Sequence, residues 1–212
     1  KPGQPLIEIG PGLMALTQPL VERTGQLTVI ELDRDLAARL RTKPQLRVIE
    51  SDVLKVNFTA LAQELGVPKL RVAGNLPYNI SSPILFHALD HAAAISDMTF
   101  MLQKEVVDRM AAGPGSKVYG RLSVMLQAYC DVQSLFVVPP GAFRPPPKVD
   151  SAVARLVPKD PASVGIIDRQ RFAEVVRAAF GQRRKTLRNA LNGVCTPEQF
   201  DAAGVRPDAR AE

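Results

Sequence analysis

Residues 75–78 read Asn75-Leu76-Pro77-Tyr78 and follow an apolar run with the composition of a strand. This tetrapeptide suits methylation of the exocyclic nitrogen of a planar base, whose lone pair is delocalised into the ring. The Asn75 side-chain oxygen and the main-chain carbonyl of Leu76 or Pro77 can each accept one N–H, which orients the amine toward a methyl donor. Pro77 stiffens the turn, and the Tyr78 ring offers a stacking face. We therefore predict these four residues as catalytic, although a plain surface turn has the same composition.

Glycines and acids occur where three earlier strand-like runs end. Gly10 and Gly12 would let a ligand approach the backbone at the start of a helical pattern. Glu31 is placed for two ribose hydroxyls, and Asp52 for an amino group of a nucleotide base. Each acid alone could instead cap a helix or lie on the surface, and dinucleotide dehydrogenases share the glycine motif. The predicted cofactor-binding residues are Glu8, Gly10, Gly12, Glu31, Asp52, Val53 and Asn75.

Seven apolar runs alternate with helical patterns, and this alternation predicts an α/β fold with a mostly parallel sheet. A proline-rich loop separates the last two runs, so we expect those two strands to pair antiparallel. The predicted strands are residues 5–9, 27–32, 46–49, 70–74, 98–102, 132–138 and 152–157. The predicted helices are residues 13–23, 35–41, 58–65, 83–91, 104–111 and 122–129.

The sequence changes character near residue 160. Residues 159–165 read as a linker, and residues 168–192 read as basic helical sequence. Thr196 and Pro197 are the residue types expected at the N-cap and first position of one more helix. We predict two domains: an α/β domain of residues 1–158 and a small, basic α-helical domain of residues 159–212.

The net charge of +6 is concentrated in one segment. Residues 169–188 contain seven basic residues and one acid, Glu174, so the basic and acidic residues of the other 192 positions balance. A solvated helix face is the alternative explanation, but such faces usually mix charges of both signs. We predict that Arg183, Arg184, Lys185 and Arg188 bind nucleic-acid phosphates.

Composition narrows the class of protein further. The chain is 46% hydrophobic and has no apolar run long enough to span a membrane. Its two cysteines, Cys130 and Cys195, lie far apart, which indicates a reducing, cytoplasmic compartment. His87 and His91 have the spacing of a zinc-binding pair, but no glutamate follows His87 and no third ligand is evident. We therefore expect no metal and no membrane partner.

The order of motifs along nearly the whole chain resembles the kasugamycin-resistance family of rRNA adenine dimethyltransferases. The proline-rich segment and the Gln-Arg-Arg-Lys-Thr segment are more specific than the glycine loop. The motifs are residues 8–12, Val29-Ile-Glu-Leu-Asp33, Asn75-Leu-Pro-Tyr78, Met101-Leu-Gln-Lys-Glu-Val106, Tyr119-Gly-Arg-Leu-Ser123, residues 139–152 and Gln182-Arg-Arg-Lys-Thr186.

This resemblance implies a monomeric enzyme with a Rossmann-like fold that uses S-adenosylmethionine as its cofactor. It implies methyl transfer to N6 of two adjacent adenosines, in a hairpin near the 3′ end of 16S rRNA, during small ribosomal subunit biogenesis. By the same resemblance Phe143 would help to hold the flipped adenine; a core anchor for its loop is the alternative. The family's Gly-Gln-Asn-Phe-Leu motif, and the end of its C-terminal domain, are not among the 212 residues, so we expect a longer natural chain.

Three other functions share part of this pattern. A large-subunit rRNA adenine methylase would have a similar site and the same chemistry. A non-catalytic ribosome-assembly factor could retain the fold, although the intact residues 75–78 argue against it. An NAD-dependent dehydrogenase would leave residues 75–78 and the basic segment unexplained.

Overall fold

The computed structural model describes residues 5–182 and 184–212, which fall into two compact units. The first unit is Lys1–Val107 with Asp131–Pro158, and the second is Asp108–Cys130 with Lys159–Glu212. The sequence-based boundary after residue 158 matches one of these limits. Residues 108–130 group with the C-terminal part instead, because their aromatic residues pack there: the rings of Tyr119 and Phe180 lie 5.8 Å apart.

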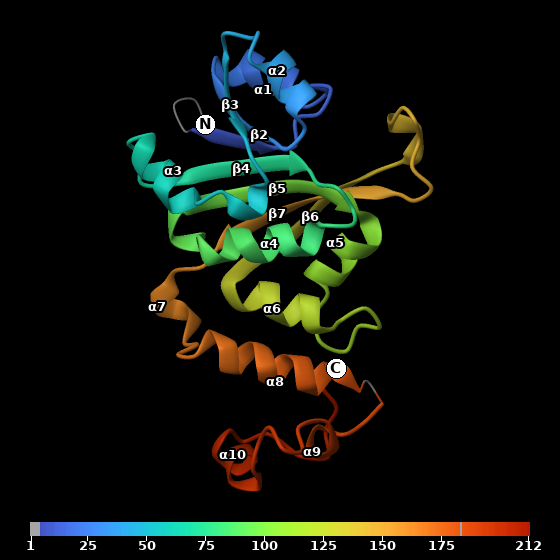
Figure 1. The fold of residues 1–212 in the computed structure, drawn as a ribbon. Helices are drawn as coiled ribbons and strands as arrows, with labels where there is room; N and C mark the ends of the chain where they lie inside the picture. Colours follow the sequence, from blue (N-terminus) through green and yellow to red (C-terminus); the bar gives the residue numbers. More distant parts are fainter. Residues whose placement is uncertain (1–4, 183) are drawn as a thin grey trace. The chain divides into compact units, whose positions relative to one another are not determined.

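The first unit contains a seven-stranded sheet in the order β3-β2-β1-β4-β5-β7-β6 (Figure 1). The pairs β1–β2, β1–β4, β2–β3 and β4–β5 are parallel, and β7 runs antiparallel to β5. All seven predicted strands and the mostly parallel α/β architecture are confirmed. The strands are β1 Leu6–Ile9, β2 Leu27–Glu31, β3 Leu46–Glu50, β4 Leu70–Asn75, β5 Ile95–Gln103, β6 Cys130–Val138 and β7 Ser151–Pro158.

Helices connect most of these strands close to the predicted positions. The main difference is the first helix, which begins at Thr17 rather than at residue 13. Residues 10, 12 and 14 have positive φ angles, and this backbone forms a loop that cannot continue into an α-helix. The helices up to residue 129 are α1 Thr17–Thr24, α2 Arg34–Leu40, α3 Phe58–Glu64, α4 Ser81–Asp90, α5 Lys104–Ala111 and α6 Arg121–Tyr129, with the 3₁₀ turns η1 Val53–Lys55 and η2 Ala92–Ala94.

One face of β5 carries the core of the first unit. Met98, Phe100 and Leu102 are fully buried and pair with Leu156, Ala154 and Ala152 of β7, which are buried as well. Side chains of a strand alternate between faces, so these three residues share one side of the sheet. Burial of such side chains, at about 25 cal/mol per Å² of apolar surface, is the main force that holds β5 in place.

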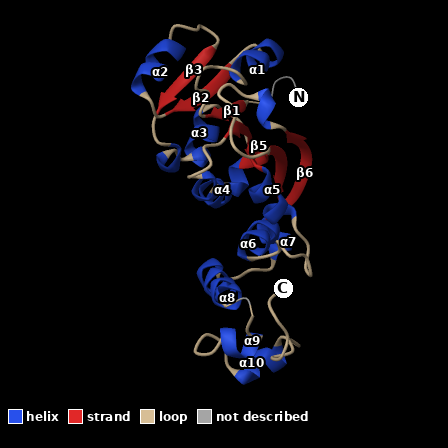
Figure 2. Cartoon of the chain, turned by 90° about the vertical axis from the view of Figure 1, so that its right-hand side faces the viewer, coloured by secondary structure: helices blue, strands red, loops and turns tan. Residues whose placement is uncertain are grey.

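The second unit is helical, as Figure 2 shows, apart from Cys130 at the start of β6. Asp168 caps α8, because its Oδ1 accepts hydrogen bonds from the backbone N–H groups of Gln170 and Arg171, each at 2.9 Å. Thr196 and Pro197 lie at the N-cap and first turn of α10, as predicted. The helices are α7 Pro161–Val164, α8 Arg169–Gly181, α9 Leu187–Ala190 and α10 Pro197–Ala202, and η3 Pro140–Ala142 lies in the first unit.

The basic sequence predicted to be helical over residues 168–192 forms two helices with a break between them. Helix α8 ends at Gly181, and α9 starts after Thr186, whose backbone is extended. Glycine and a β-branched residue both disfavour helix continuation, which explains the break. Residues from both sides of the break form a small core: Ala179, Leu191 and Phe200.

A close approach between β1 and β4 depends on Gly74. Gly74 pairs with Ile9, and a Cβ at this position would lie 2.6 Å from the Ile9 carbonyl oxygen. Real Cβ atoms do not come so close, and the neighbour here is rigid strand backbone. The strands would have to separate to accept any side chain.

We therefore expect Gly74→Ala to lower the free energy of unfolding by about 1–3 kcal/mol, because it overpacks the strand junction. Urea denaturation followed by circular dichroism measures this change. Gly141→Ala is the matched control, since nothing lies within 4 Å of a Cβ built there. Equal midpoints for the two variants would show that the junction is loose.

Candidate active site

The Asn75–Tyr78 hinge is anchored by its second residue. The Leu76 side chain is only 1% exposed, and its backbone N–H donates to the Met101 carbonyl of β5 at 3.1 Å. Asn75, the last residue of β4, remains exposed. A buried anchor beside an exposed amide fixes the backbone from which Asn75 projects, and this is the geometry that an acceptor for an incoming amine needs.

The rest of the hinge is held by hydrogen bonds. The Pro77 carbonyl accepts from the Ile80 N–H at 3.2 Å, which closes a turn. The Tyr78 hydroxyl lies 2.8 Å from the Ser151 hydroxyl at the start of β7. This bond joins residues 73 positions apart, and it fixes the orientation of the half-buried Tyr78 ring.

The glycine loop is tied to the end of β2 by Glu31. Gly10 and Gly12 have φ angles of +67° and +52°, which favour glycine. The Gly12 N–H donates to Glu31 Oε2 at 3.2 Å, and the Asp33 N–H donates to Oε1 at 3.0 Å. Both carboxylate oxygens keep further acceptor capacity, so Glu31 can orient the loop and still accept from hydroxyl groups.

Asp52 follows β3 and caps η1, because its Oδ1 accepts the Leu54 N–H at 3.0 Å. The capping role that was the alternative explanation is therefore real. The Ser51 N–H donates to the Glu31 carbonyl at 3.0 Å, which connects the ends of β2 and β3. Val53, in the same 3₁₀ turn, is 8% exposed.

Glu8 is the unusual acid of the site, since it lies inside β1 and is only 1% exposed. Burial raises the pKa of this carboxyl to about 7, and the nearby Thr17 hydroxyl lowers it by less. Within the described residues, neither Glu8 Oε2 nor the buried Thr17 hydroxyl has a hydrogen-bond partner of ordinary geometry. Burial of such polar atoms without a good hydrogen bond is unusual, and it marks this end of β1 as a candidate ligand site.

The strand register brings most of the predicted residues together. Ile9 pairs with Gly74 and with Ile30, so Gly10, Asn75 and Glu31 follow at the ends of three neighbouring strands. Glu8 lies inside β1, two residues before Gly10. Because the strands are parallel, these residues share the carboxyl edge of the sheet, where ligands bind in open α/β sheets.

The predicted RNA-binding residues lie elsewhere in the chain. Phe143 is half-buried in the loop after η3, where its N–H donates to the Pro140 carbonyl at 3.1 Å. Arg184, Lys185 and Arg188 are exposed residues of the second unit. Arg183 lies outside the described residues.

Three further residues contribute to the site without having been predicted: Met14, Thr17 and Ser151. Met14 had no signal in the sequence, because L-residues other than glycine rarely adopt a left-handed conformation. Thr17 and Ser151 had none, since their roles depend on tertiary proximity.

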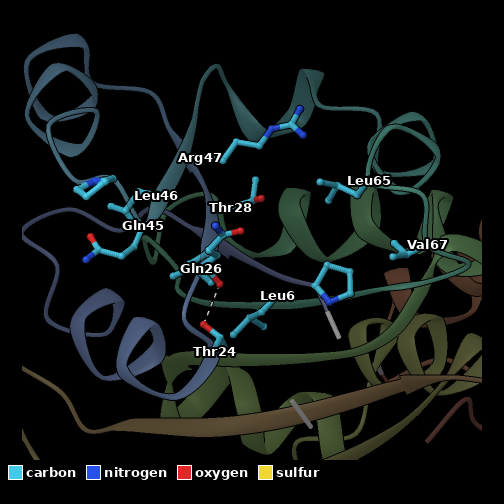
Figure 3. Close-up of a pocket in the computed structure, with 12 residues that line it drawn as sticks. Leu6, Thr24, Gln26, Thr28, Gln45, Leu46, Arg47, Leu65 and Val67 are labelled. Atoms are coloured by element: carbon cyan, nitrogen blue, oxygen red, sulfur yellow. Dashed lines mark hydrogen bonds between the residues drawn. The ribbon is translucent and has the colours of Figure 1, made fainter. Parts of the chain in front are cut away.

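A cavity of about 440 Å³ lies at the opposite edge of the sheet (Figure 3). Its walls include Leu6, Leu27 and Leu46, the first residues of β1, β2 and β3. It contains none of the predicted site residues, and its wall at Pro5 adjoins residues that the structure does not describe. The chemistry of the side chains, rather than cavity size, therefore identifies the candidate site.

Over residues 5–182 and 184–212, no group of three or more histidine, cysteine or acidic side chains is arranged to hold a metal ion. His87 Nε2 lies 2.8 Å from the Val56 carbonyl, and His91 Nδ1 lies 3.0 Å from the Thr59 hydroxyl. Within the same described residues, no helix has the length and apolar character needed to cross a bilayer.

The sheet order, its antiparallel end and the hinge at the carboxyl edge define the class of Rossmann-like methyltransferases. The chain belongs to the ribosomal RNA adenine dimethylase family, whose model matches residues 1–212. This membership argues against the dehydrogenase alternative. Members of the family depend on S-adenosylmethionine.

Named relatives agree with this assignment. The chain is 73% identical to ribosomal RNA small subunit methyltransferase A of Xanthomonas campestris pv. campestris (strain B100), and the match covers 100% of this chain and 81% of that protein. It is also 73% identical to the protein of the same name from Xanthomonas axonopodis pv. citri (strain 306), over 99% of this chain and 80% of the relative.

Two solved structures resemble the fold over almost the whole chain. One is a dimethyladenosine transferase from Plasmodium falciparum, with a TM-score of 0.74, 28% identity and coverage of 95% of this chain and 75% of that chain. The other is the 23S rRNA methyltransferase ErmE, with a TM-score of 0.69, 27% identity and coverage of 99% and 85%.

The buried Glu8 carboxyl predicts a pH-dependent stability. Its pKa is raised in the folded state, so between pH 4.5 and about 7 the folded protein keeps a proton that the unfolded chain has lost. The free energy of unfolding therefore falls as pH rises through this window, and the loss is nearly complete at about pH 8.

Glu8→Gln removes this titration. Relative to the unaltered chain, the free energy of unfolding of the variant should rise by about 2 kcal/mol between pH 5 and pH 8, because glutamine has no proton to lose. Urea denaturation at the two pH values gives the comparison. The exposed Glu22→Gln variant is the control and should track the unaltered chain. If the difference in free energy of unfolding between Glu8→Gln and the unaltered chain were the same at both pH values, the pKa of Glu8 would not be raised by folding.

Proposed function

We propose that this chain transfers methyl groups from S-adenosylmethionine to N6 of two adjacent adenosines, in a hairpin near the 3′ end of small-subunit rRNA. The observation that carries the proposal is the exposed Asn75 amide on a buried Leu76 anchor, next to the glycine loop. Relatives that are 73% identical are named as small-subunit rRNA methyltransferases, which supports this substrate over the large subunit. The proposal includes action in the cytoplasm, as a monomer, on a precursor of the small ribosomal subunit.

The residues at the carboxyl edge fit such a cofactor chemically. Glu31 would accept from the ribose hydroxyls, and Asp52 with Val53 would line the adenine end. Gly10 and Gly12 leave open space beside the backbone. Glu8 Oε2, which has no hydrogen-bond partner among the described residues, would accept an N–H or O–H of the ligand. When bound, S-adenosylmethionine supplies an electrophilic methyl group on a sulfonium.

The hinge would hold the acceptor amine. Asn75 Oδ1 accepts one N–H of the adenine amine, and a main-chain carbonyl accepts the other. We assign the second role to Leu76, because the Pro77 carbonyl already accepts the Ile80 N–H. These two acceptors fix the direction of the nitrogen lone pair. A dedicated general base is unnecessary, because an amine with a fourth bond is strongly acidic.

Aromatic residues would hold the flipped base. The Tyr78 ring is fixed by its hydrogen bond to Ser151, and a ring that is already fixed loses little entropy when a base stacks on it. Phe143 is half-buried, and its ring would contact the base from the loop that follows η3.

Asn75→Ala should lower kcat for rRNA methylation at least 100-fold, because it removes one of the two acceptors that orient the amine. The thermal midpoint should stay within about 2 °C, since the side chain is exposed. Incorporation of labelled methyl groups into small subunits measures the rate. Asn79→Ala, in the exposed part of the same turn, is the control with unchanged kcat. Turnover of Asn75→Ala near that of the control would refute the assignment.

Replacement of Arg184, Lys185 and Arg188 by glutamine should weaken rRNA binding and flatten its salt dependence. Each lost phosphate contact reduces the slope of log K against log salt by about 0.7–0.9. Filter binding between 50 and 300 mM salt measures the slope. The triple variant Arg23→Gln, Lys43→Gln, Lys69→Gln removes the same charge from exposed positions of the first unit. Identical slopes for the two triple variants would show that Arg184, Lys185 and Arg188 do not bind the RNA phosphates.

Methylation of a large-subunit substrate is the second candidate function, because ErmE matches 99% of this chain. Isolated small and large subunits, incubated separately with the chain and labelled cofactor, distinguish the two. We expect label in small-subunit rRNA at adenosine. Label found only in large-subunit rRNA would show that the large subunit, and not the small subunit, is the substrate.

A further inference from the structure

Met14 has a backbone conformation that is rare for its residue type. Its φ angle is +70°, and within the described residues no other non-glycine residue has a positive φ. It continues the alternation of Gly10 and Gly12, so three left-handed residues follow one another at every second position. A side chain with a Cβ is strained in this region, and a loop keeps such strain only where its surroundings impose it.

Packing of the Met14 side chain explains why the strain persists. The side chain lies against the buried core cluster of Leu27, Val29 and Leu40, from β2 and α2. Two hydrogen bonds fix the backbone on either side: the Met14 N–H donates to Pro11 at 2.8 Å, and the Gln18 N–H donates to the Met14 carbonyl at 3.1 Å. The unbranched thioether can fill an irregular space in this cluster.

The loop is therefore held to β2 at two points. Met14 packs on the cluster of Leu27, Val29 and Leu40, and the Gly12 N–H binds Glu31 Oε2 at 3.2 Å. Only one residue separates Gly12 from Met14, so a shift of Met14 would move the Gly12 N–H away from the carboxylate. Glu31 would then lose the bond that orients the oxygen proposed to bind ribose.

We propose that Met14 is a positioning residue for cofactor binding, which clamps the glycine loop onto the core of β2 and α2 and so orients Gly12 and Glu31. This inference rests on the proposed function. Met14 does not itself need to touch the cofactor. Leu20 packs on the same core cluster from α1, outside the loop. A Leu20 variant therefore shows what loss of packing alone does, without a change in the loop.

The test is the Kd for S-adenosylmethionine, measured by calorimetry on the unaltered chain and on four variants, with urea unfolding of each. Met14→Ala should bind about tenfold more weakly, because the clamp is lost. Met14→Leu keeps an apolar anchor and should bind within about twofold of the unaltered chain. Leu20→Ala should lower the urea midpoint without changing Kd.

Met14→Gly tests the strain itself. Its urea midpoint should exceed that of Met14→Ala, the reverse of the usual order, because glycine adopts the left-handed conformation freely. A lower midpoint for the glycine variant would overturn the strain argument. Equal Kd values for Met14→Ala and the unaltered chain, or an equal loss in Leu20→Ala, would overturn the positioning role alone. No binding by the unaltered chain would overturn the proposed function with it.

Discussion

The structure depends on the tight pairing of β1 with β4 at Ile9 and Gly74. Because Gly74 has no side chain, the two strands approach until a Cβ would meet the Ile9 carbonyl at 2.6 Å. The next residue on each strand is functional: Gly10 begins the glycine loop and Asn75 begins the hinge. One backbone contact therefore sets the separation between the proposed cofactor and substrate ends of the site, and an error there would be felt directly in the alignment of the reacting groups.

The two flanking strands stabilise this junction in different ways. On the β2 side, the Glu31 carboxylate accepts hydrogen bonds from the N–H groups of Gly12 and Asp33, and these charge-assisted bonds fix the loop. On the β5 side, Leu76 is fixed by burial and by a backbone bond to Met101. Met14 has a strained backbone, and Glu8 Oε2 lacks a hydrogen-bond partner among the described residues; both lie at the proposed cofactor end of the site. Contacts with a bound ligand there would offset the energetic cost of both features.

The sequence predicts the elements better than it predicts their ends and contacts. Strands and the hinge were found because apolar periodicity and turn chemistry act locally. The late start of α1 was missed, because a methionine gives no sign that it will adopt a left-handed conformation. The break between α8 and α9 was missed because charge and helix propensity continue across Gly181. The bond between Tyr78 and Ser151, and the grouping of residues 108–130 with α8, depend on tertiary packing that no local pattern encodes.

A crystal structure of the chain with S-adenosylhomocysteine and an adenosine-containing rRNA hairpin tests the central claim most directly. The account predicts the N6 atom of an unstacked adenine about 3 Å from Asn75 Oδ1 and from the Leu76 carbonyl, with Glu31 on the ribose of the cofactor product. An adenine bound away from the hinge, or an Asn75 amide turned from both ligands, would contradict it.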